Sequence, residues 1–258
     1  MGRSYNRRMM QADFKDHFSA VSGQYAASRP EYPDALFAWI GSIAPGNALV
    51  WEAGCGSGQA SRGLAPHFAQ VFATDPSLAQ IEQASAPANV RFAVEPGEQC
   101  SLPAASADAV CVAQALHWFA REAFFAETAR VLRPGGVLVA WGYGDVVVPD
   151  ALAETNHALQ ADIRADWPSE RALVDAAYSG FQWPFERIDA PAFAMTARWP
   201  LPRLLGYFAS YSASRRYRAR TGHDPVAAHR SAFEAACPDR EAPLELRWPL
   251  FIHARRKP

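Results

Sequence analysis

The sequence predicts an α/β fold built on a parallel sheet, and two patterns predict it. Strand-like and helix-like segments alternate from about residue 47 to residue 142, and the strands are short apolar runs typical of a sheet covered on both faces. This alternation favours right-handed βαβ crossovers, which produce parallel strands. The chain has 258 residues, 50% of them apolar, so it can bury a sizeable core.

The elements of the first half follow from apolar spacing and stop signals. A helical period predicts a helix over residues 34–44, which Pro45-Gly46-Asn47 ends. Ser77 and Gln80 match a capping box, which predicts that a helix opens at Ser77. Further helices are expected near 59–68 and 124–132, and strands near 48–51, 71–75, 90–94, 108–113 and 137–141.

The last hundred residues are less regular. Helices are expected near 149–165, 169–178, 201–220 and 226–236, and one strand is expected within 185–199. Strict alternation from Leu244 to Ile252 predicts a final strand. Pro249 lies inside that strand, which indicates either an edge position or a bulge.

Composition narrows the functional classes. Lys and Arg number 25 and Asp and Glu number 26, so the net charge of −1 argues against a large nucleic-acid surface. The four cysteines have no C-x-x-C spacing, so we expect no metal site and reduced, buried thiols. No apolar run reaches the roughly 18 residues of a membrane span, and no signal-peptide core precedes Phe14, so we expect a cytoplasmic protein without membrane contact.

The segment from Glu52 to Gly58 carries the chemistry. Its G-x-G-x-G spacing, at Gly54, Gly56 and Gly58, lies between a buried strand and a helix, which favours a nucleotide-binding loop. The acidic Glu52 repels a pyrophosphate and suits an ammonium group. Asp75 ends the next strand, where an acid typically accepts hydrogen bonds from ribose hydroxyls. A ligand with an ammonium group and a free ribose describes S-adenosylmethionine.

Several stretches carry a resemblance to a known family. They include the glycine loop, Asp75-Pro76-Ser77, Gln114-Ala115-Leu116-His117-Trp118 and Arg130 to Gly136. On these residues the chain resembles the class I S-adenosylmethionine-dependent methyltransferases. It is most similar to the type 11 subgroup and, within it, to the trans-aconitate methyltransferase branch.

The resemblance implies a Rossmann-like fold and an organisation of the chain. The sheet would have seven strands with helices on both faces, and its last strand would be antiparallel and inserted inside the sheet, which favours a bulge at Pro249 with the proline unpaired. Residues 1–33 would form a tail and a cofactor lid. Residues 34–258 would form one domain: a cofactor half (34–145), a helical insertion with substrate or cap elements (146–242) and a final strand (243–254).

The resemblance also implies roles around the cofactor. The three loop glycines would contact its methionine part, Glu52 its ammonium group and Asp75 its ribose, with Pro76 and Ser77 beside the adenine. The other expected cofactor-binding residues are Gly97, Glu98, Ala113 and Gln114. Glu98 is equally compatible with a solvated loop acid.

Candidates for catalysis and substrate binding each keep a structural alternative. His117 is a general base or a packed, hydrogen-bonded histidine. Arg29 binds a carboxylate or pins the lid through an acid, and Tyr25 packs over the cofactor. Substrate-binding positions are expected at Trp118, Trp141 and Tyr143, with core packing as the alternative for the tryptophans. The basic cluster of Arg215, Arg216, Arg218 and Arg220 is a solvated helix face or supplies one group to an acidic substrate.

The predicted activity is methyl transfer from S-adenosylmethionine to a small molecule, with O-methylation of a carboxylate as one form of it. A non-catalytic S-adenosylmethionine-binding or regulatory protein on the same fold is the alternative. A nicotinamide oxidoreductase needs a different glycine spacing. The substrate, the methylated atom and the oligomeric state stay open.

Overall fold

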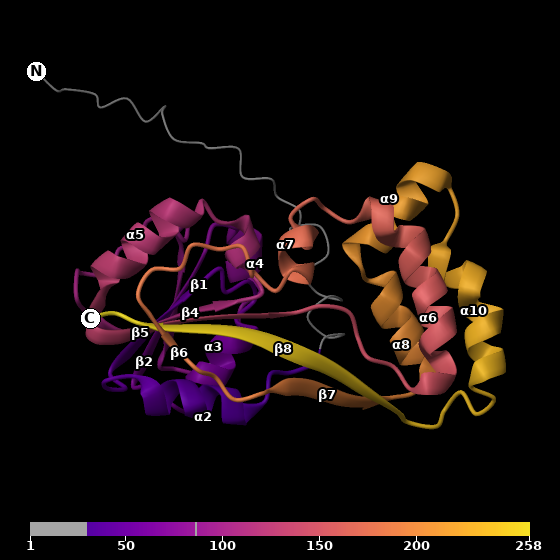
Figure 1. Ribbon diagram of the computed structural model, residues 1–258, viewed down its shortest axis with the longest axis horizontal. Helices are drawn as coiled ribbons and strands as arrows, with labels where there is room; N and C mark the ends of the chain where they lie inside the picture. Colours follow the sequence, from indigo (N-terminus) through magenta and orange to yellow (C-terminus); the bar gives the residue numbers. More distant parts are fainter. Residues whose placement is uncertain (1–29, 86) are drawn as a thin grey trace, which may run out of the picture.

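The computed structural model describes residues 30–85 and 87–258, which form one eight-stranded mixed sheet with helices (Figure 1). The strands are β1 (Leu49–Ala53), β2 (Gln70–Asp75), β3 (Val90–Val94), β4 (Ala107–Ala113), β5 (Leu132–Tyr143), β6 (Glu186–Ile188), β7 (Ala194–Trp199) and β8 (Leu244–Arg256). The helices are α2 (Asp34–Ile43), α3 (Gln59–Leu64), α4 (Leu78–Ile81), η1 (Leu116–Trp118), α5 (Arg121–Val131), α6 (Asp150–Ile163), η2 (Arg164–Asp166), α7 (Arg171–Asp175), α8 (Leu201–Ala209), α9 (Ser212–Thr221) and α10 (Pro225–Ala236).

Seven strands follow the order β3-β2-β1-β4-β5-β8-β6, and β7 pairs with β8 beside this path. The strands from β1 to β5 pair in parallel, whereas β8 runs antiparallel between β5 and β6. The predicted α/β fold with an inserted antiparallel last strand is therefore confirmed. The eighth strand, β7, lengthens the sheet toward helices α6, α8, α9 and α10.

Two hydrophobic clusters cover the two faces of the parallel strands, which explains their apolar runs. Val50 of β1 packs in one cluster with Leu36 of α2 and Leu64 of α3. The next residue, Trp51, packs in the other cluster with Phe124 of α5. Successive side chains of a strand point to opposite faces, so a continuous apolar strand fills both clusters.

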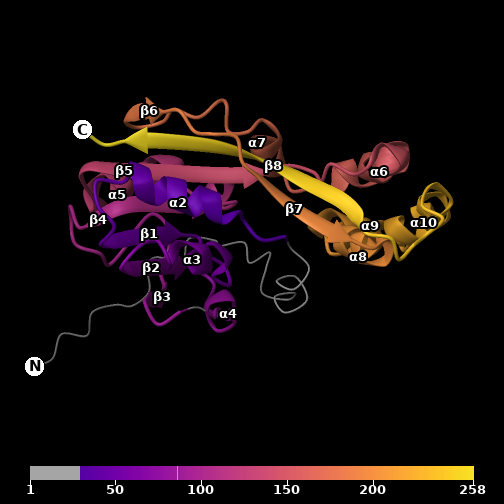
Figure 2. The ribbon, with the colours of Figure 1, turned by 90° about the horizontal axis from the view of Figure 1, so that it is seen from below.

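A third cluster belongs to the second half of the chain. Helices α6, α8, α9 and α10 gather at one end of the molecule, away from β1 to β3, and β7 and the first half of β8 reach toward them (Figures 1 and 2). The cluster combines helix residues such as Leu159, Phe208 and Phe233 with Trp248 of β8. We call these four helices the cap; its role in substrate binding stays a prediction.

Pro249 lies at an irregularity on one side of β8, as the bulge expectation requires. On the side of β5, Tyr143 pairs with Leu250 and the next pair is Val147 with Arg247, so one extra residue lies opposite the stretch that contains Pro249. On its other side β8 pairs with β7 through Pro249, opposite Ala194, without a shift. The proline therefore has no pairing partner on the side of β5, where its missing N–H interrupts no ladder.

Several element boundaries differ from the expectation. Ser77 stands at the N-cap of α4 but its side chain makes no capping hydrogen bond, and α4 has only 4 residues. The strand expected within 185–199 is two strands, β6 and β7, and the helix expected over 201–220 is two helices, α8 and α9. β5 begins at Leu132, but residues 133–136 interrupt its register with β4, and regular pairing starts at Val137, where the strand was expected to begin.

Two expectations from composition concern the thiols and membrane-spanning segments. All four cysteines are free and buried. Among residues 30–85 and 87–258, no helix has the length and hydrophobicity that crossing a membrane requires.

Candidate active site

The glycine loop lies where β1 ends and has a backbone that other residues do not adopt easily. Gly54 and Gly58 have φ values of 71° and 82°. A Cβ on Gly54 would stand 2.7 Å from Cβ of Ala115, and one on Gly58 would stand 2.8 Å from the ring of Phe92. The N–H groups of Gly54 and Cys55 both donate to the carbonyl oxygen of Thr74, which holds the loop against β2. Glycine is therefore required at Gly54 and Gly58, because it tolerates a positive φ and has no Cβ to collide with neighbouring side chains.

Glu52 is a buried acid directly beneath this loop. Its side chain is 1% exposed, and the Ser61 hydroxyl of α3 donates a hydrogen bond to Oε2. Burial, opposed by the Ser61 hydrogen bond and assisted by the nearby charge of Asp75, raises the pKa of Glu52 to about 8. The ionised form would be favoured by a cation brought to the loop.

Asp75 joins the glycine loop to the end of β2. Its Oδ2 accepts a hydrogen bond of 2.9 Å from the Gly56 N–H, and its Oδ1 accepts one of 2.9 Å from the Ser77 N–H. Pro76 lies between Asp75 and Ser77 in the chain. The structure therefore brings together the predicted ammonium-binding and ribose-binding acids with the glycines, at the carboxyl edge of β1 and β2.

The segment after β3 approaches the same loop through Phe119. A Cβ on Gly97 would stand 2.9 Å from the Phe119 ring, and the ring also lies 3.0 Å from the position of a Cβ on Gly54. Glu98 accepts a hydrogen bond of 2.7 Å from the N–H of Ala120, the N-cap residue of α5, with its Oε1. A carboxylate at a helix N-terminus is stabilised there, so Glu98 has a structural partner in addition to its predicted place beside the cofactor.

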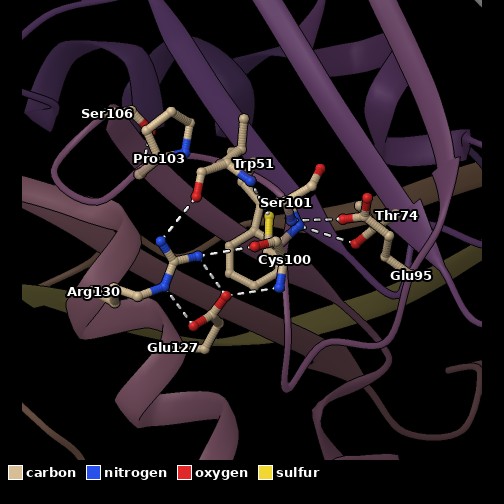
Figure 3. A network of polar contacts seen from close by, with 10 residues as sticks. Trp51, Thr74, Glu95, Cys100, Ser101, Pro103, Ser106, Glu127 and Arg130 are labelled. Atoms are coloured by element: carbon tan, nitrogen blue, oxygen red, sulfur yellow. Dashed lines mark hydrogen bonds and ion pairs between the residues drawn. The ribbon is translucent and has the colours of Figure 1, made fainter. Parts of the chain in front are cut away.

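A network between this segment and α5 fixes its course (Figure 3). Arg130 donates to the carbonyl oxygens of Cys100 and Leu102, each at 2.9 Å, and also bonds Glu127. Glu127 in turn accepts a hydrogen bond of 2.6 Å from the Cys100 N–H. Hydrogen bonding to Arg130 holds the pKa of Glu127 below its usual range, so this carboxylate stays ionised. Sequence reasoning missed this support for Gly97 and Glu98.

Gln114 closes the gap between the ends of β4 and β5. It has a φ of 52°, which is unusual for a residue other than glycine. Its side-chain amide donates to the Tyr143 carbonyl oxygen at 3.0 Å and accepts from the Tyr143 N–H at 2.8 Å. Ala113, the last residue of β4, is half-buried beside it. The strained backbone and the paired hydrogen bonds give Gln114 a positioning role at this edge.

His117 lies in η1, immediately after this edge. Its Nδ1 shares a hydrogen bond of 2.8 Å with the hydroxyl of Tyr178, a buried residue 61 positions later in the chain. Burial lowers the pKa of His117 to about 4, so the ring is neutral at physiological pH. Trp118 is half-buried with its ring 4.8 Å from that of His117. No short motif in the sequence signals Tyr178, because only the fold brings it to His117.

Aromatic side chains meet at the end of β5. Tyr32 contacts Trp141 with ring centroids 5.7 Å apart, and it contacts Tyr143 with centroids 6.4 Å apart. Trp141 is fully buried and also packs on Phe37 of α2, so its ring belongs to the core. Tyr143 is 5% exposed and belongs to the hydrophobic cluster of the cap. Tyr25 and Arg29, the predicted lid residues, lie outside the described residues.

Comparisons with known proteins identify the family. A family described as a methyltransferase domain matches residues 51–140. A Dictyostelium discoideum protein named as a methyltransferase is 32% identical over 204 residues, which cover 77% of this chain and 78% of that protein. The chain belongs to this methyltransferase family.

Two further relatives agree. A solved structure from Anaeromyxobacter dehalogenans, described as a type II methyltransferase, has a TM-score of 0.84 and 44% identity, over 88% of this chain and 97% of that chain. A Saccharomyces cerevisiae protein named as an S-adenosylmethionine-dependent methyltransferase is 34% identical over 132 residues, 47% of this chain and 45% of that protein. The family implies S-adenosylmethionine as the methyl donor, and the methyltransferase is an enzyme dependent on it.

The residues of the methyltransferase fit this donor on two observations. The buried Glu52 carboxyl is held mostly in its neutral form by desolvation, and an ammonium group beside it would favour ionisation. At Gly56 an added Cβ would meet nothing nearer than the Gln80 side-chain oxygen at 3.7 Å, so the loop backbone is open to a ligand there. These residues would hold the donor. The resemblance of this chain to the trans-aconitate methyltransferase branch stays a prediction.

Proposed function

We propose that the methyltransferase transfers the methyl group to a carboxylate oxygen of a small organic acid. The observation that carries the proposal is Arg215 in α9. Its Nη1 is buried and has no hydrogen-bond partner within the described part of the chain. An arginine nitrogen removed from water without an acceptor is costly, and a substrate carboxylate would supply one.

Arg215 lies in the cap, one helical turn after a residue of the hydrophobic cluster that reaches the end of β5. Its backbone N–H donates to the carbonyl oxygen of Tyr211, and Tyr211 shares a hydrophobic cluster with Tyr143. Tyr143 is also the residue whose backbone Gln114 holds at the edge of the sheet. The cap cluster is thus continuous with the edge where the family binds its donor, which supports a substrate site between the two.

His117 supports the same class of acceptor. A carboxylate is ionised at neutral pH, so it can attack the methyl group without first losing a proton. His117, with its pKa lowered to about 4, is a weak base, and its Nδ1 is occupied by the Tyr178 hydroxyl. An acceptor that needs no base suits this site better than an alcohol or a phenol, whose proton must be removed.

The chain then contributes binding, alignment and exclusion of water. When bound, S-adenosylmethionine supplies an electrophilic methyl group on a sulfonium. Arg215 would fix the acid by a bidentate contact, and holding two reactants in line contributes roughly 7–11 kcal/mol. The aromatic rings of Tyr32 and Tyr143 would shield the site from water. We infer that the enzyme works in the cytoplasm on a dissolved metabolite.

The test combines a product analysis with two variants. A panel of small carboxylic acids, phenols and amines is incubated with the full chain and S-adenosylmethionine, and release of S-adenosylhomocysteine is measured. We expect turnover with a carboxylic acid and a base-labile methyl ester as product. Turnover restricted to amines or phenols would overturn the carboxylate assignment while leaving the methyltransferase activity intact.

The variants separate Arg215 from the general charge of the cap. A charge-assisted hydrogen bond contributes about 1.5–3 kcal/mol, so Arg215→Gln should raise KM for the acid roughly ten- to a hundredfold. Arg230→Gln is the matched control, because Arg230 lies exposed on α10 and faces Glu234 at 3.9 Å. Equal KM values for both variants would show that Arg215 does not bind the substrate.

A further inference from the structure

A pocket lies at the far edge of the sheet, beside β8 and away from the glycine loop. β7 pairs with β8 through Pro249, the Leu250 N–H donates to the carbonyl oxygen of Phe193 just before β7, and β6 pairs with β8 only from Ala254. Residues 251–253 therefore pair with neither strand on that side. The cavity there has a volume of about 560 Å³. Its lining includes Phe181, Trp183, Arg187, Ile252, His253 and Arg255.

The arginine end of the pocket lies away from the methyl-transfer site. Two strands, β4 and β5, stand between β1 and β8. Arg255 lies opposite Leu138, near the start of the β5–β8 pairing, whereas the donor edge is formed by the carboxyl ends of the parallel strands, where Tyr143 stands opposite Leu250. Leu250 also lines the pocket, so the pocket extends from that edge along β8, and its arginine end lies apart from the donor.

Two arginines lie side by side at the pocket. Arg187 of β6 and Arg255 of β8 are direct cross-strand partners. Like charges in this position destabilise a sheet. Arg187 pairs with Asp189 at 3.0 Å, but both side chains are strongly exposed, at 75% and 89%. Arg255 donates from Nη1 to the neighbouring carbonyl oxygen of Ala254. The positive charge is therefore only partly balanced.

The titration of the neighbouring groups reflects the same excess of positive charge. Burial and, after it, the charge of Arg187 lower the pKa of Arg255. Burial also lowers the pKa of His253, and both arginines lower it further against the opposing hydrogen bond to Ala177. An anion beside the two arginines would reverse these electrostatic effects.

An aromatic scaffold holds the guanidinium of Arg255 in place. Its Cζ lies 5.2 Å from the centroid of the Trp183 ring. That ring stacks on His253 with centroids 4.4 Å apart and an interplanar angle of 16°. His253 is fixed in turn by a hydrogen bond of 2.7 Å between Nε2 and the Ala177 carbonyl oxygen. A stacked guanidinium loses little freedom when it binds, which favours a planar carboxylate.

We propose that this pocket is a second ligand site, which binds an organic carboxylate with a compact apolar body. Arg255 and Arg187 bind the carboxylate, and the rings of Phe181 and Trp183, on the same face of the sheet as Arg255, contact the apolar part. The mixture of apolar walls with a few polar groups of one charge is typical of small-molecule sites.

The binding test uses three probes with neutral counterparts. Phenylacetate, benzoate and hexanoate, each paired with its amide, are titrated into the full chain saturated with S-adenosylhomocysteine and followed by calorimetry and ligand-detected NMR. We expect at least one carboxylate to bind at one site per chain and its amide to bind at least tenfold more weakly. Absence of binding by all three acids, or equal binding of acid and amide, overturns the proposal.

Variants locate the bound acid. Arg255→Gln and Arg187→Gln should each weaken binding roughly ten- to a hundredfold and leave S-adenosylhomocysteine affinity unchanged. Arg198→Gln is the matched control, because Arg198 lies on β7, 69% exposed, and pairs with Glu245. Arg187 is the more exposed of the two, so its variant keeps the test valid if Arg255→Gln does not fold. Wild-type affinity in both pocket variants, or loss of binding in Arg215→Gln instead, overturns the assignment.

Discussion

The donor edge of the sheet and the cap differ in how their charges are satisfied. At the donor edge, Glu52 receives a hydrogen bond from Ser61, and Asp75 receives two from backbone N–H groups. In the cap, Arg215 has a buried nitrogen without an acceptor within the described residues. The first arrangement is preorganised by the chain itself, whereas the second has an open donor to which we assign the carboxylate of the proposed substrate. We infer that the donor edge is set by the fold and that substrate choice resides in the cap.

The largest effect is expected from a substitution that disrupts the glycine loop of the donor edge. Gly54→Val should reduce S-adenosylhomocysteine affinity on the order of a hundredfold, because its backbone has a positive φ of 71° and a Cβ would stand 2.7 Å from Ala115. Calorimetry measures the affinity, and thermal unfolding verifies the fold. Gly206→Ala is the control, because nothing lies within 4 Å of its added Cβ. Similar affinity in Gly54→Val and the wild type would exclude a close approach of donor and loop.

A smaller loss is expected when one acid of the same edge is removed. Asp75→Ala should weaken S-adenosylhomocysteine binding roughly ten- to a hundredfold, since a charge-assisted hydrogen bond to the ribose contributes about 1.5–3 kcal/mol. Asp189→Ala, at an 89% exposed position, serves as the control in the same calorimetric titration. If the two variants bind equally well, the ribose contact lies elsewhere.

Glu52 gives a pH dependence that sharpens the comparison. Its pKa is raised to about 8 in the free protein, so below that pH the carboxyl is mostly protonated. Binding of an ammonium group favours the ionised form and therefore releases a proton. Affinity should rise roughly tenfold from pH 6 to pH 7 and level off near pH 8.

The matched variant isolates this proton from those of the ligand. Glu52→Gln cannot ionise, so the difference in pH dependence between wild type and variant belongs to Glu52. Calorimetry in buffers of different ionisation enthalpy counts the released proton directly. Identical pH profiles for the two proteins would show that Glu52 does not contact the ammonium group.

The same comparison explains what the sequence predicts and what it does not. The donor edge is encoded locally: Gly54, Gly56 and Gly58 stand close together in the chain, and their spacing is legible because each needs a special backbone. Partners that are distant in sequence leave no such pattern. Tyr178 reaches His117 across 61 positions, and Arg130 fixes the carbonyl oxygens of Cys100 and Leu102 through tertiary contacts.

Two local signals had different outcomes. The proline at position 249 predicts an interrupted ladder, and the pairing on the side of β5 does shift by one residue across it. Ser77 has the capping-box spacing, yet its backbone N–H is already held by Asp75 and its helix has only 4 residues. At Ser77 a neighbouring contact prevailed over the local preference.

The smallest effect is expected at His117, and it tests the acceptor chemistry. A general base contributes typically 10²–10⁴-fold to a rate, whereas a carboxylate acceptor needs none. If the carboxylate proposal holds, His117→Gln should lower kcat less than about fivefold and cost about 1 kcal/mol of folding free energy through the lost hydrogen bond to Tyr178.

Tyr178→Phe separates the two roles of the ring. It removes the hydroxyl at 2.8 Å from Nδ1 but leaves the imidazole in place, so stability should fall as in His117→Gln while kcat stays at the wild-type value. Thermal unfolding and single-turnover rates with the identified acid measure both quantities. A fall in kcat beyond a hundredfold in His117→Gln, with Tyr178→Phe unchanged, would make His117 a base. The acceptor would then carry a proton that must be removed, which a carboxylate at neutral pH does not.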